Sequence, residues 1–416
     1  MPKSYLSNEP AAARAKANLF DPVRQITMRI QALKNNGHQV DKIEILVLGG
    51  TWSVYPSKYQ ADFIRDCFYA ANTFGKEKKR KPKTLEQEQT INETAKYKII
   101  GLTLETRPDF ISPTEIKKMR MFGVTRVQLG IQHTDNKILK YIKRGHTLEQ
   151  SIEATRSLKE AGFKVDHHYM PDLPGSTPAL DLKMFKYVFS SPDLAPDQIK
   201  IYPCIVNKYA QIYKWYKSGK YRPMSDSQLV NLLLKVKQLV PPYMRINRLI
   251  RDIPKESITA GNKITNLRQL LQEKLAKQNK FCQCIRCREV KGESFDLKNI
   301  KLIKREYKAS GGKEIFLSYE SKDQKKIYAF LRLRFNQTGD TAYVRELHVY
   351  GQMIPVGSKA LGTQHLGFGR KLMQEAEKGK AESQALKEIV FQLDEDYVIE
   401  GDDELLELKI LQKINQ

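Results

Sequence analysis

The stretch KIIGLTLETRPDFISPTEIKKMRMFGVTRVQLGIQH, residues 98–133, decides the fold, because it predicts a strand, a helix and a second strand in close succession. The first apolar run ends at Glu105, and VTRVQLG forms the second. Between them, Ser112 is placed as an N-cap, Pro113 takes the first helical position and Glu115 completes a capping box. This order predicts two parallel strands joined by a right-handed crossover.

The same alternation continues on both sides of this stretch. IEILVL, residues 43–48, is a buried-strand run followed by a helical stretch. Downstream, Thr147 caps another helix, and FKVDHHYM, residues 163–170, forms a fourth strand. The pattern, which extends from Lys42 to about Tyr202, predicts a parallel α/β domain with its chemistry at the C-terminal ends of the strands.

Length and charge restrict the class of protein. The chain has 416 residues, enough for two or three domains. Lys and Arg outnumber Asp and Glu by 71 to 47, so the formal charge is +24. This excess favours nucleic acid as partner over a basic surface kept for solubility. No stretch is long and apolar enough to cross a bilayer, and MPKSYLSNEP is not a signal peptide, so we predict a cytoplasmic protein without a membrane partner.

Three of the five cysteines form a tight group, Cys282-Gln-Cys284-Ile-Arg-Cys287. In a cytosolic protein this spacing predicts a structural zinc site, favoured over three free thiols. Three cysteines need a fourth ligand, and Cys204 is the candidate, although a buried apolar cysteine is the alternative there. Cys67, in the middle of a helix, is predicted to be a small core residue.

Polar residues and glycines follow the predicted strands. Gly49, Gly50 and Thr51 come directly after the first strand, where glycines let a ligand approach the backbone. Glu105 and Arg107 end the second strand as an opposite-charge pair, suited to an amino acid's ammonium and carboxylate or to a surface ion pair. The third and fourth strands end near Gln132 and His168, respectively.

A second α/β unit begins near Lys301, with the strand patterns KIYAFLRLRF and TAYVRELHVYG. The turn QHLGFG then opens a helix, and in the acetyltransferase fold called GNAT such a turn presents backbone N–H groups to the coenzyme A pyrophosphate. The residues expected to hold coenzyme A are Gln364, Gly367 and Gly369 in this turn and Glu346, Leu347 and His348 in the strand before it.

Two basic segments with nearby aromatics are candidates for RNA phosphates and bases, and solvated helix faces are the alternative. The candidates are Lys140, Lys143 and Arg144 in ILKYIKRGH, and Arg245, Arg248 and Arg251 in RINRLIRDIP, spaced by three along a helix or turn.

Taken together, the strand ends resemble the S-adenosylmethionine-binding half of the radical-SAM fold. The chain as a whole resembles the catalytic subunit of Elongator and its bacterial and archaeal relatives, from about Ser4 to Glu377. The resemblance is carried, in order, by SYLSNEPAAARA, GHQVDKIEILVLGGTWS, INETAKYKIIGLTLETRPD, VTRVQLGIQH, HYMPDLPG, RINRLIRDIP and VRELHVYGQ.

The resemblance implies an α/β fold with three parts. Residues 1–250 form a partial (β/α) barrel of radical-SAM type, residues 251–300 a basic and zinc-binding linker, and residues 301–416 a GNAT-like acetyltransferase domain whose C-terminal part is missing or divergent. The expected cofactors are S-adenosylmethionine, at the four strand ends, acetyl-CoA and zinc.

The resemblance also implies an activity, the carboxymethylation of C5 of the wobble uridine in tRNA. A 5′-deoxyadenosyl radical takes a hydrogen from the acetyl methyl of acetyl-CoA, the carbon radical adds to C5, and hydrolysis leaves the carboxymethyl group. The uridine is flipped out of the anticodon loop to react, so the expected partner is the anticodon stem-loop. A homodimer is a further expectation.

Family members carry three closely spaced cysteines just before the SYLSNEP-like segment, and these bind a four-iron, four-sulfur cluster. Here Met-Pro-Lys precedes that segment, so we expect no ligands for the cluster on this chain. The alternative to the enzyme is therefore a truncated protein that binds tRNA and acetyl-CoA without radical activity.

Overall fold

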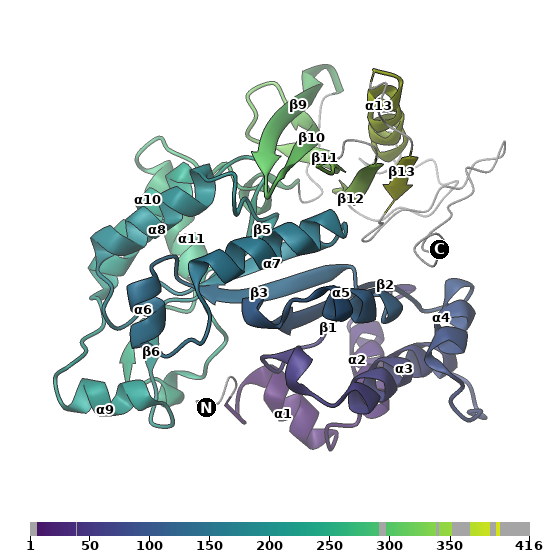
Figure 1. Ribbon diagram of the computed structural model, residues 1–416, viewed down its shortest axis with the longest axis horizontal. Helices are drawn as coiled ribbons and strands as arrows, with labels where there is room; N and C mark the ends of the chain where they lie inside the picture. Colours follow the sequence, from purple (N-terminus) through teal and green to yellow (C-terminus); the bar gives the residue numbers. More distant parts are fainter. Residues whose placement is uncertain are drawn as a thin grey trace.

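The computed structural model describes residues 6–38, 40–290, 297–337, 341–351, 367–382 and 388–391. Two sheets form the two domains, and helices cover the larger one on its outer side (Figure 1). The six parallel strands of the first sheet run in the order β1 (Lys42–Leu46), β2 (Lys98–Thr106), β3 (Arg126–Gln132), β4 (Lys164–Tyr169), β5 (Gln198–Ile201) and β7 (Arg245–Arg248).

Helices connect these strands. Their bounds are α1 (Pro10–Ala17), α2 (Pro22–Asn35), α3 (Ser57–Thr73), α4 (Leu85–Glu93), α5 (Pro113–Met121), α6 (Asn136–Tyr141), α7 (Leu148–Glu160), α8 (Pro178–Ser190), α9 (Gln211–Lys217) and α10 (Asp226–Leu239). The predicted N-caps are confirmed, since the Ser112 hydroxyl accepts the Glu115 N–H and Thr147 forms a capping box with Gln150. The capping box expected at Glu115 is wrong, because that carboxylate pairs with Lys118 instead. Each cap satisfies a backbone donor that the first turn leaves free.

The two faces of the first sheet differ in polarity because side chains alternate along each strand. Leu104, Val127 and Val165 are buried in the main hydrophobic core, beneath the helices. One residue further along, Glu105, Gln128, Asp166, Gln198 and Arg245 are aligned across five strands by the register of the sheet. One face is therefore apolar and the other carries a row of polar and charged side chains, which we call the polar row.

The segment predicted as a linker packs with the first domain. A short ribbon of β6 (Ile205–Val206) and β8 (Ala260–Gly261) precedes α11 (Leu267–Ala276) and α12 (Ile285–Arg288). Leu271, Cys282 and Cys284 belong to the main core cluster of that domain. The basic stretch after Pro242, expected as a helix or turn, instead begins with the strand β7.

The second sheet has the order β13 (Glu388–Phe391), β12 (Thr341–Val349), β11 (Ile327–Phe335), β10 (Gly312–Ser321) and β9 (Ile300–Ala309), with α13 (Phe368–Glu382) packed against it. Its strands pair antiparallel except β12 and β13, which are parallel. The register of β11 and β12 shifts between Arg332 and Leu333, because β12 holds one extra residue, Arg345.

Buried charges join the two domains. Asp197, just before β5, binds Arg345 of β12 through both carboxylate oxygens, at 2.6 and 2.7 Å. Glu314 of β10 binds Lys159 of α7 at 3.0 Å and also Arg345. We call the group the interdomain ion cluster, and its members are Lys159, Glu160, Asp197, Glu314, Arg332, Arg334, Arg345 and Glu346.

None of the helices that the structure describes combines the length and apolarity needed to span a membrane.

Candidate active site

On the polar face of the sheet, side chains near the C-terminal ends of the strands form a connected network. His168 lies on β4 with its Nδ1 3.7 Å from a carboxylate oxygen of Glu105 and its Nε2 3.2 Å from Oε1 of Gln128. The same Gln128 oxygen accepts a hydrogen bond from Lys200 of β5, at 2.6 Å. Four neighbouring strands thus contribute one polar side chain each to a single site.

Burial sets the protonation of this network. It lowers the pKa of His168 well below its ordinary value, and the nearby Lys200 lowers it further. Burial also lowers the pKa of Lys200, while Asp166 and Glu105 oppose that shift. His168 is therefore neutral at physiological pH and has one ring nitrogen that donates and one that accepts.

Asp166 continues the polar row toward the second domain. Its Oδ2 accepts a hydrogen bond from Asn247 of β7 at 3.1 Å, whereas its buried Oδ1 has no hydrogen-bond partner among the described residues. Burial raises the pKa of this carboxyl. Lys164, two residues earlier, binds Glu346 of the second domain at 2.7 Å. The polar face therefore runs from the strand ends to the domain interface.

The strand ends leave room for a small ligand. Gly50 has φ +97°, a left-handed conformation that favours glycine, and a side-chain carbon built on Gly49 would meet nothing within 4 Å. At the end of β3, the buried Oε1 of Gln132 has no hydrogen-bond partner among the described residues. A buried acceptor without a partner fits a ligand that brings a donor, such as an ammonium or an amino group.

The expected pair of Glu105 and Arg107 is corrected by the structure. Arg107 binds Asp109 through two of its guanidinium nitrogens, and this pairing raises its pKa. Glu105 lies beside His168 instead. Arg107 therefore pairs with Asp109, two positions away, while Glu105 lies next to His168. Glu105 and Arg107 do not form an ion pair with each other.

Three of the six residues expected to bind tRNA have partners within the protein. Arg144 donates to the Gly130 carbonyl at 2.6 and 3.1 Å, and burial lowers its pKa to about 10. Arg245 binds Glu289 and Tyr350, and Arg251 binds Glu9. The three guanidinium groups neutralise acids or cap carbonyls within the fold, and their contact with tRNA stays a prediction. Three remain at the surface, namely Lys140, Lys143 and Arg248, the last of them beside Asp252.

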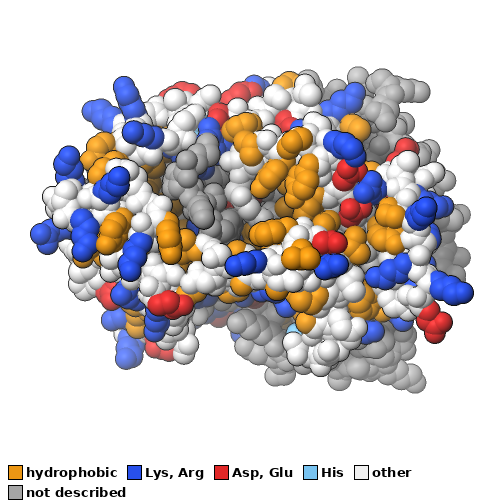
Figure 2. Space-filling model, turned by 90° about the horizontal axis from the view of Figure 1, so that it is seen from below, with side chains coloured by type: hydrophobic (Ala, Val, Ile, Leu, Met, Phe, Trp, Pro, Cys, Tyr) orange, Lys and Arg blue, Asp and Glu red, His pale blue; other side chains and the backbone are white. Residues whose placement is uncertain are grey.

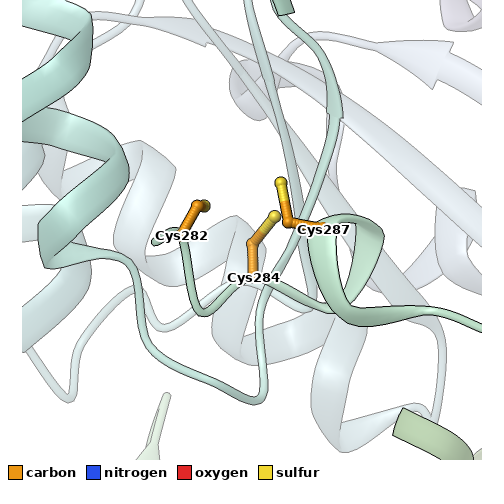
Figure 3. Close-up of side chains that lie close together, drawn as sticks. All are labelled: Cys282, Cys284 and Cys287. Atoms are coloured by element: carbon orange, nitrogen blue, oxygen red, sulfur yellow. The ribbon is translucent and has the colours of Figure 1, made fainter. Parts of the chain in front are cut away.

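Cys282, Cys284 and Cys287 lie with their sulfur atoms within 4.8 Å of one another (Figure 3). Hydrogen bonds from the other two thiols lower the pKa of Cys287, and Lys237, whose Nζ lies 3.3 Å from its sulfur, lowers it further. Sulfur atoms this close, one of them held as thiolate, fit a tetrahedral metal such as zinc.

Cys204 is not part of this group. It packs in a separate apolar cluster with Ile138 and Leu173, and burial raises the pKa of its thiol to about 12. The expectation that it supplies the fourth ligand is therefore corrected. Cys67 is buried in the main core on α3, as predicted.

The three-cysteine group lies away from the strand ends that hold His168. The backbone N–H of Ile285, within that group, donates to Met244, which immediately precedes β7, so the cysteines lie at the N-terminal edge of the sheet. Within the described residues no three cysteines meet at the C-terminal edge of the sheet.

In the second domain, β12 and β13 pair only along Thr341–Val344. The backbone from Arg345 to Val349 has no strand partner on that side among the described residues. Leu347 is buried, and the ring of His348 packs 4.1 Å from that of Tyr350. The α13 helix begins directly after Gly367, so its first N–H groups, including that of Gly369, lie at a helix start. Gln364 lies outside the described residues.

Sequence reasoning missed four members of the polar network, namely Gln128, Asp166, Lys200 and Asn247. The sequence does carry a signal for these residues, because it departs from the continuous apolar run that a buried parallel strand normally shows. Charged or amide residues at every second position, as in KVDHHY and QIKI, indicate a strand with one face turned to a polar interior.

Two family models match this chain, the radical SAM superfamily over residues 19–180 and the radical SAM C-terminal domain over residues 196–277. The tRNA uridine(34) acetyltransferase of Methanocaldococcus infernus is 42% identical over 405 residues, covering 94% of this chain and 75% of that protein. Elongator complex protein 3 of Homo sapiens is 37% identical over 395 residues, covering 90% of this chain and 70% of its own length.

A solved structure has a similar fold. It is described as the archaeal Methanocaldococcus infernus Elp3 with an N-terminus deletion, and it aligns with a TM-score of 0.84 at 41% identity, over 91% of each chain.

Proposed function

This chain belongs to the family of tRNA uridine(34) acetyltransferases and Elongator complex protein 3, and from that premise we propose that it modifies C5 of the wobble uridine of tRNA. The single observation that carries the proposal is the similarity to these enzymes along 94% of the chain. It favours the enzyme over a protein that only binds tRNA and acetyl-CoA. The product that we propose is the carboxymethyl derivative of uridine, with acetyl-CoA as the donor.

The strand ends of the first domain suit S-adenosylmethionine. The open space at Gly49 suits its amino-acid end, and the Gln132 oxygen, which has no hydrogen-bond partner among the described residues, would accept a hydrogen bond from an ammonium or the adenine amino group. Glu105 and the neutral His168 lie at the same edge. When bound and reductively cleaved, S-adenosylmethionine supplies a radical that abstracts hydrogen. The chain's own residues would orient the ligand.

The second domain suits acetyl-CoA. The backbone of Arg345–Val349, past the end of the pairing with β13, offers hydrogen-bonding groups to a pantetheine arm. The N-terminus of α13, at Gly367 and Gly369, favours an anion such as the pyrophosphate. Because Glu346 also binds Lys164, the strand that would hold acetyl-CoA is fixed to the first domain by an ion pair.

The cysteine group at 282–287 suits a structural zinc ion. Three closely spaced sulfur atoms next to the cationic Lys237 favour a thiolate-bound metal, and the site joins α10, α11 and α12. Such a site stabilises the fold and takes no part in the reaction.

The proposal is tested by two readouts on one protein. The chain is incubated with tRNA and acetyl-CoA, and free thiol release is measured with and without tRNA. Under anaerobic reducing conditions with S-adenosylmethionine added, nucleosides from the tRNA are analysed by mass spectrometry for carboxymethyluridine at position 34. We expect tRNA to stimulate thiol release. If tRNA neither binds nor stimulates release, and no modified uridine forms, the proposed function is wrong.

A further inference from the structure

Two short segments at the C-terminal side of the first sheet form one surface whose exposed side chains are not part of the catalytic network. The first is Asn136–Lys143, which contains α6, and the second is Lys208–Arg222, which contains α9. We call this surface the aromatic–basic lip. Figure 1 places α6 and α9 beside β6 at one end of the molecule.

The lip has an unusual composition. Its second segment, KYAQIYKWYKSGKYR, contains five basic and five aromatic residues and no acid, and its first, NKILKYIK, contains three lysines, one tyrosine and no acid. Among the described residues these lysines form no ion pair, and the nearby acids are engaged elsewhere, since Asp135 caps α6 and Glu149 accepts hydrogen bonds from Asn136. The surface therefore carries a net positive charge, with the carboxylates of Asp135 and Glu149 at its edge.

The aromatic side chains are ordered and accessible. The rings of Tyr141 on α6 and Trp215 on α9 stack with centroids 5.1 Å apart and planes 21° apart. Tyr141 is 47% exposed and Tyr209 is 72% exposed. Figure 2 shows Lys and Arg side chains interspersed with hydrophobic ones at the end of the molecule where Figure 1 places α9.

The fold holds the two helices together. Ile138 of α6 and Ile212 of α9 pack into one apolar cluster with Leu173 and Cys204, which follow β4 and β5. A side-chain carbon on Gly175, which has φ +89°, would lie 3.4 Å from the Tyr141 ring, so the glycine lets this ring pack against the loop. Because the lip is anchored in this way, its rings are positioned before any ligand arrives, which lowers the entropic cost of binding.

We propose that the aromatic–basic lip binds the unpaired bases of the tRNA anticodon loop, which stack on Trp215, Tyr141 and Tyr209 while the lysines contact the phosphates. Aromatic platforms among basic side chains are the chemistry that proteins use for single-stranded RNA, because every base presents a π face. The strand ends that carry Gln132 and His168 open at the same edge of the sheet, so bases held on the lip would lie next to the wobble uridine. This inference rests on the proposed function and names the surface that holds its substrate.

The test uses tryptophan fluorescence, because the chain has only two tryptophans and Trp52 is buried in the core. The full chain is titrated with an anticodon stem-loop RNA and with the duplex stem that lacks the loop. We expect the stem-loop to quench Trp215 and the duplex to leave it almost unchanged. In Trp215→Phe, which keeps a stacked ring, the quenching should vanish while the affinity stays within about twofold.

Affinity changes give the second readout. Trp215→Ala and Tyr209→Ala should each raise the Kd for the stem-loop by about five- to a hundredfold. The Tyr209 side chain is largely exposed, so a loss of affinity in Tyr209→Ala cannot be attributed to misfolding. Tyr59→Ala, an exposed tyrosine on α3, is the matched control and should change the Kd less than twofold.

The outcomes separate the two proposals. If tRNA binds the wild type but Trp215 is not quenched and both alanine variants bind normally, the lip is not the binding surface, while the proposed function stands. Equal quenching by duplex and stem-loop, or an equal loss in Tyr59→Ala, would also overturn the inference. If the wild type binds no tRNA even at low salt, both proposals fail.

Discussion

Asp197→Asn should weaken the attachment of the second domain to the first, because this carboxylate is central to the interdomain ion cluster. Asp197 is completely buried and lies 2.6 Å from Arg345, 3.4 Å from Arg332 and 3.5 Å from Lys159. Burial opposes its charge, but Arg345 and Lys159 still hold its pKa well below the ordinary value. The carboxylate is therefore ionised in the folded chain.

The expected cost follows from these distances. Two unit charges about 4 Å apart interact by about 4 kcal/mol at an effective dielectric constant of about 20. Removing one partner of a buried ion pair typically costs about 3–5 kcal/mol, since the remaining charge stays buried without compensation. Asn keeps the shape of Asp and one acceptor, so the free energy of unfolding should fall by about 3–5 kcal/mol through the lost charge.

Urea unfolding followed by circular dichroism and by tryptophan fluorescence gives the measurement. Both tryptophans lie in the first domain, so the two signals should separate in Asp197→Asn if the second domain detaches first. Glu306→Gln, at a surface pair with Lys304 and Lys313, is the matched control and should change stability by less than about 0.5 kcal/mol. A loss below about 1 kcal/mol in Asp197→Asn would refute the reasoning.

Three further predictions concern other sites. Metal analysis should find about one zinc per wild-type chain, none in Cys284→Ser and full occupancy in Cys204→Ser; loss of zinc in Cys204→Ser would restore that residue as a ligand. Burial raises the pKa of Asp172 from 3.8 to about 7, so the folded chain binds its proton more tightly and stability should fall as pH rises between these values. The Asp172→Asn variant should not lose stability in this way. The test compares the urea midpoint at pH 5 with that at pH 8, and an equal change in the wild type and in Asp172→Asn would contradict the prediction. A side-chain carbon in Gly130→Ala would clash with the Arg144 guanidinium and displace it from the Gly130 carbonyl, so the free energy of unfolding should fall by about 1–3 kcal/mol, and an unchanged urea midpoint would contradict this.

The sequence predicted the strands and helices of the first domain well, because local signals agree there with the tertiary structure. Ser112 and Thr147 cap their helices as expected, and the apolar runs at residues 43–48 and 163–170 contain β1 and β4. Caps and apolar periodicity depend on neighbours a few residues away, so they can be read without knowing the fold.

Partners far apart in the sequence could not be predicted in the same way. Arg245 looks like a surface cation until Glu289 and Tyr350 are placed beside it. Cys204 is a plausible zinc ligand by residue type alone, yet the chain folds it into the cluster beneath the lip. In both cases the deciding contact is set by the packing of whole elements, which charge and spacing do not encode.

The interdomain ion cluster also has a consequence for synthesis on the ribosome. Asp197 and Lys159 belong to the domain that is made first, whereas Glu314 and Arg345 come from the second. Glu314 is about 117 residues behind Asp197, so at roughly 5–20 residues per second the first domain waits on the order of ten seconds for its counter-charges. During that interval Asp197 and Lys159 stay hydrated, and their burial must wait for Arg345 and Glu314, so the docking of the two domains can only follow synthesis of the second.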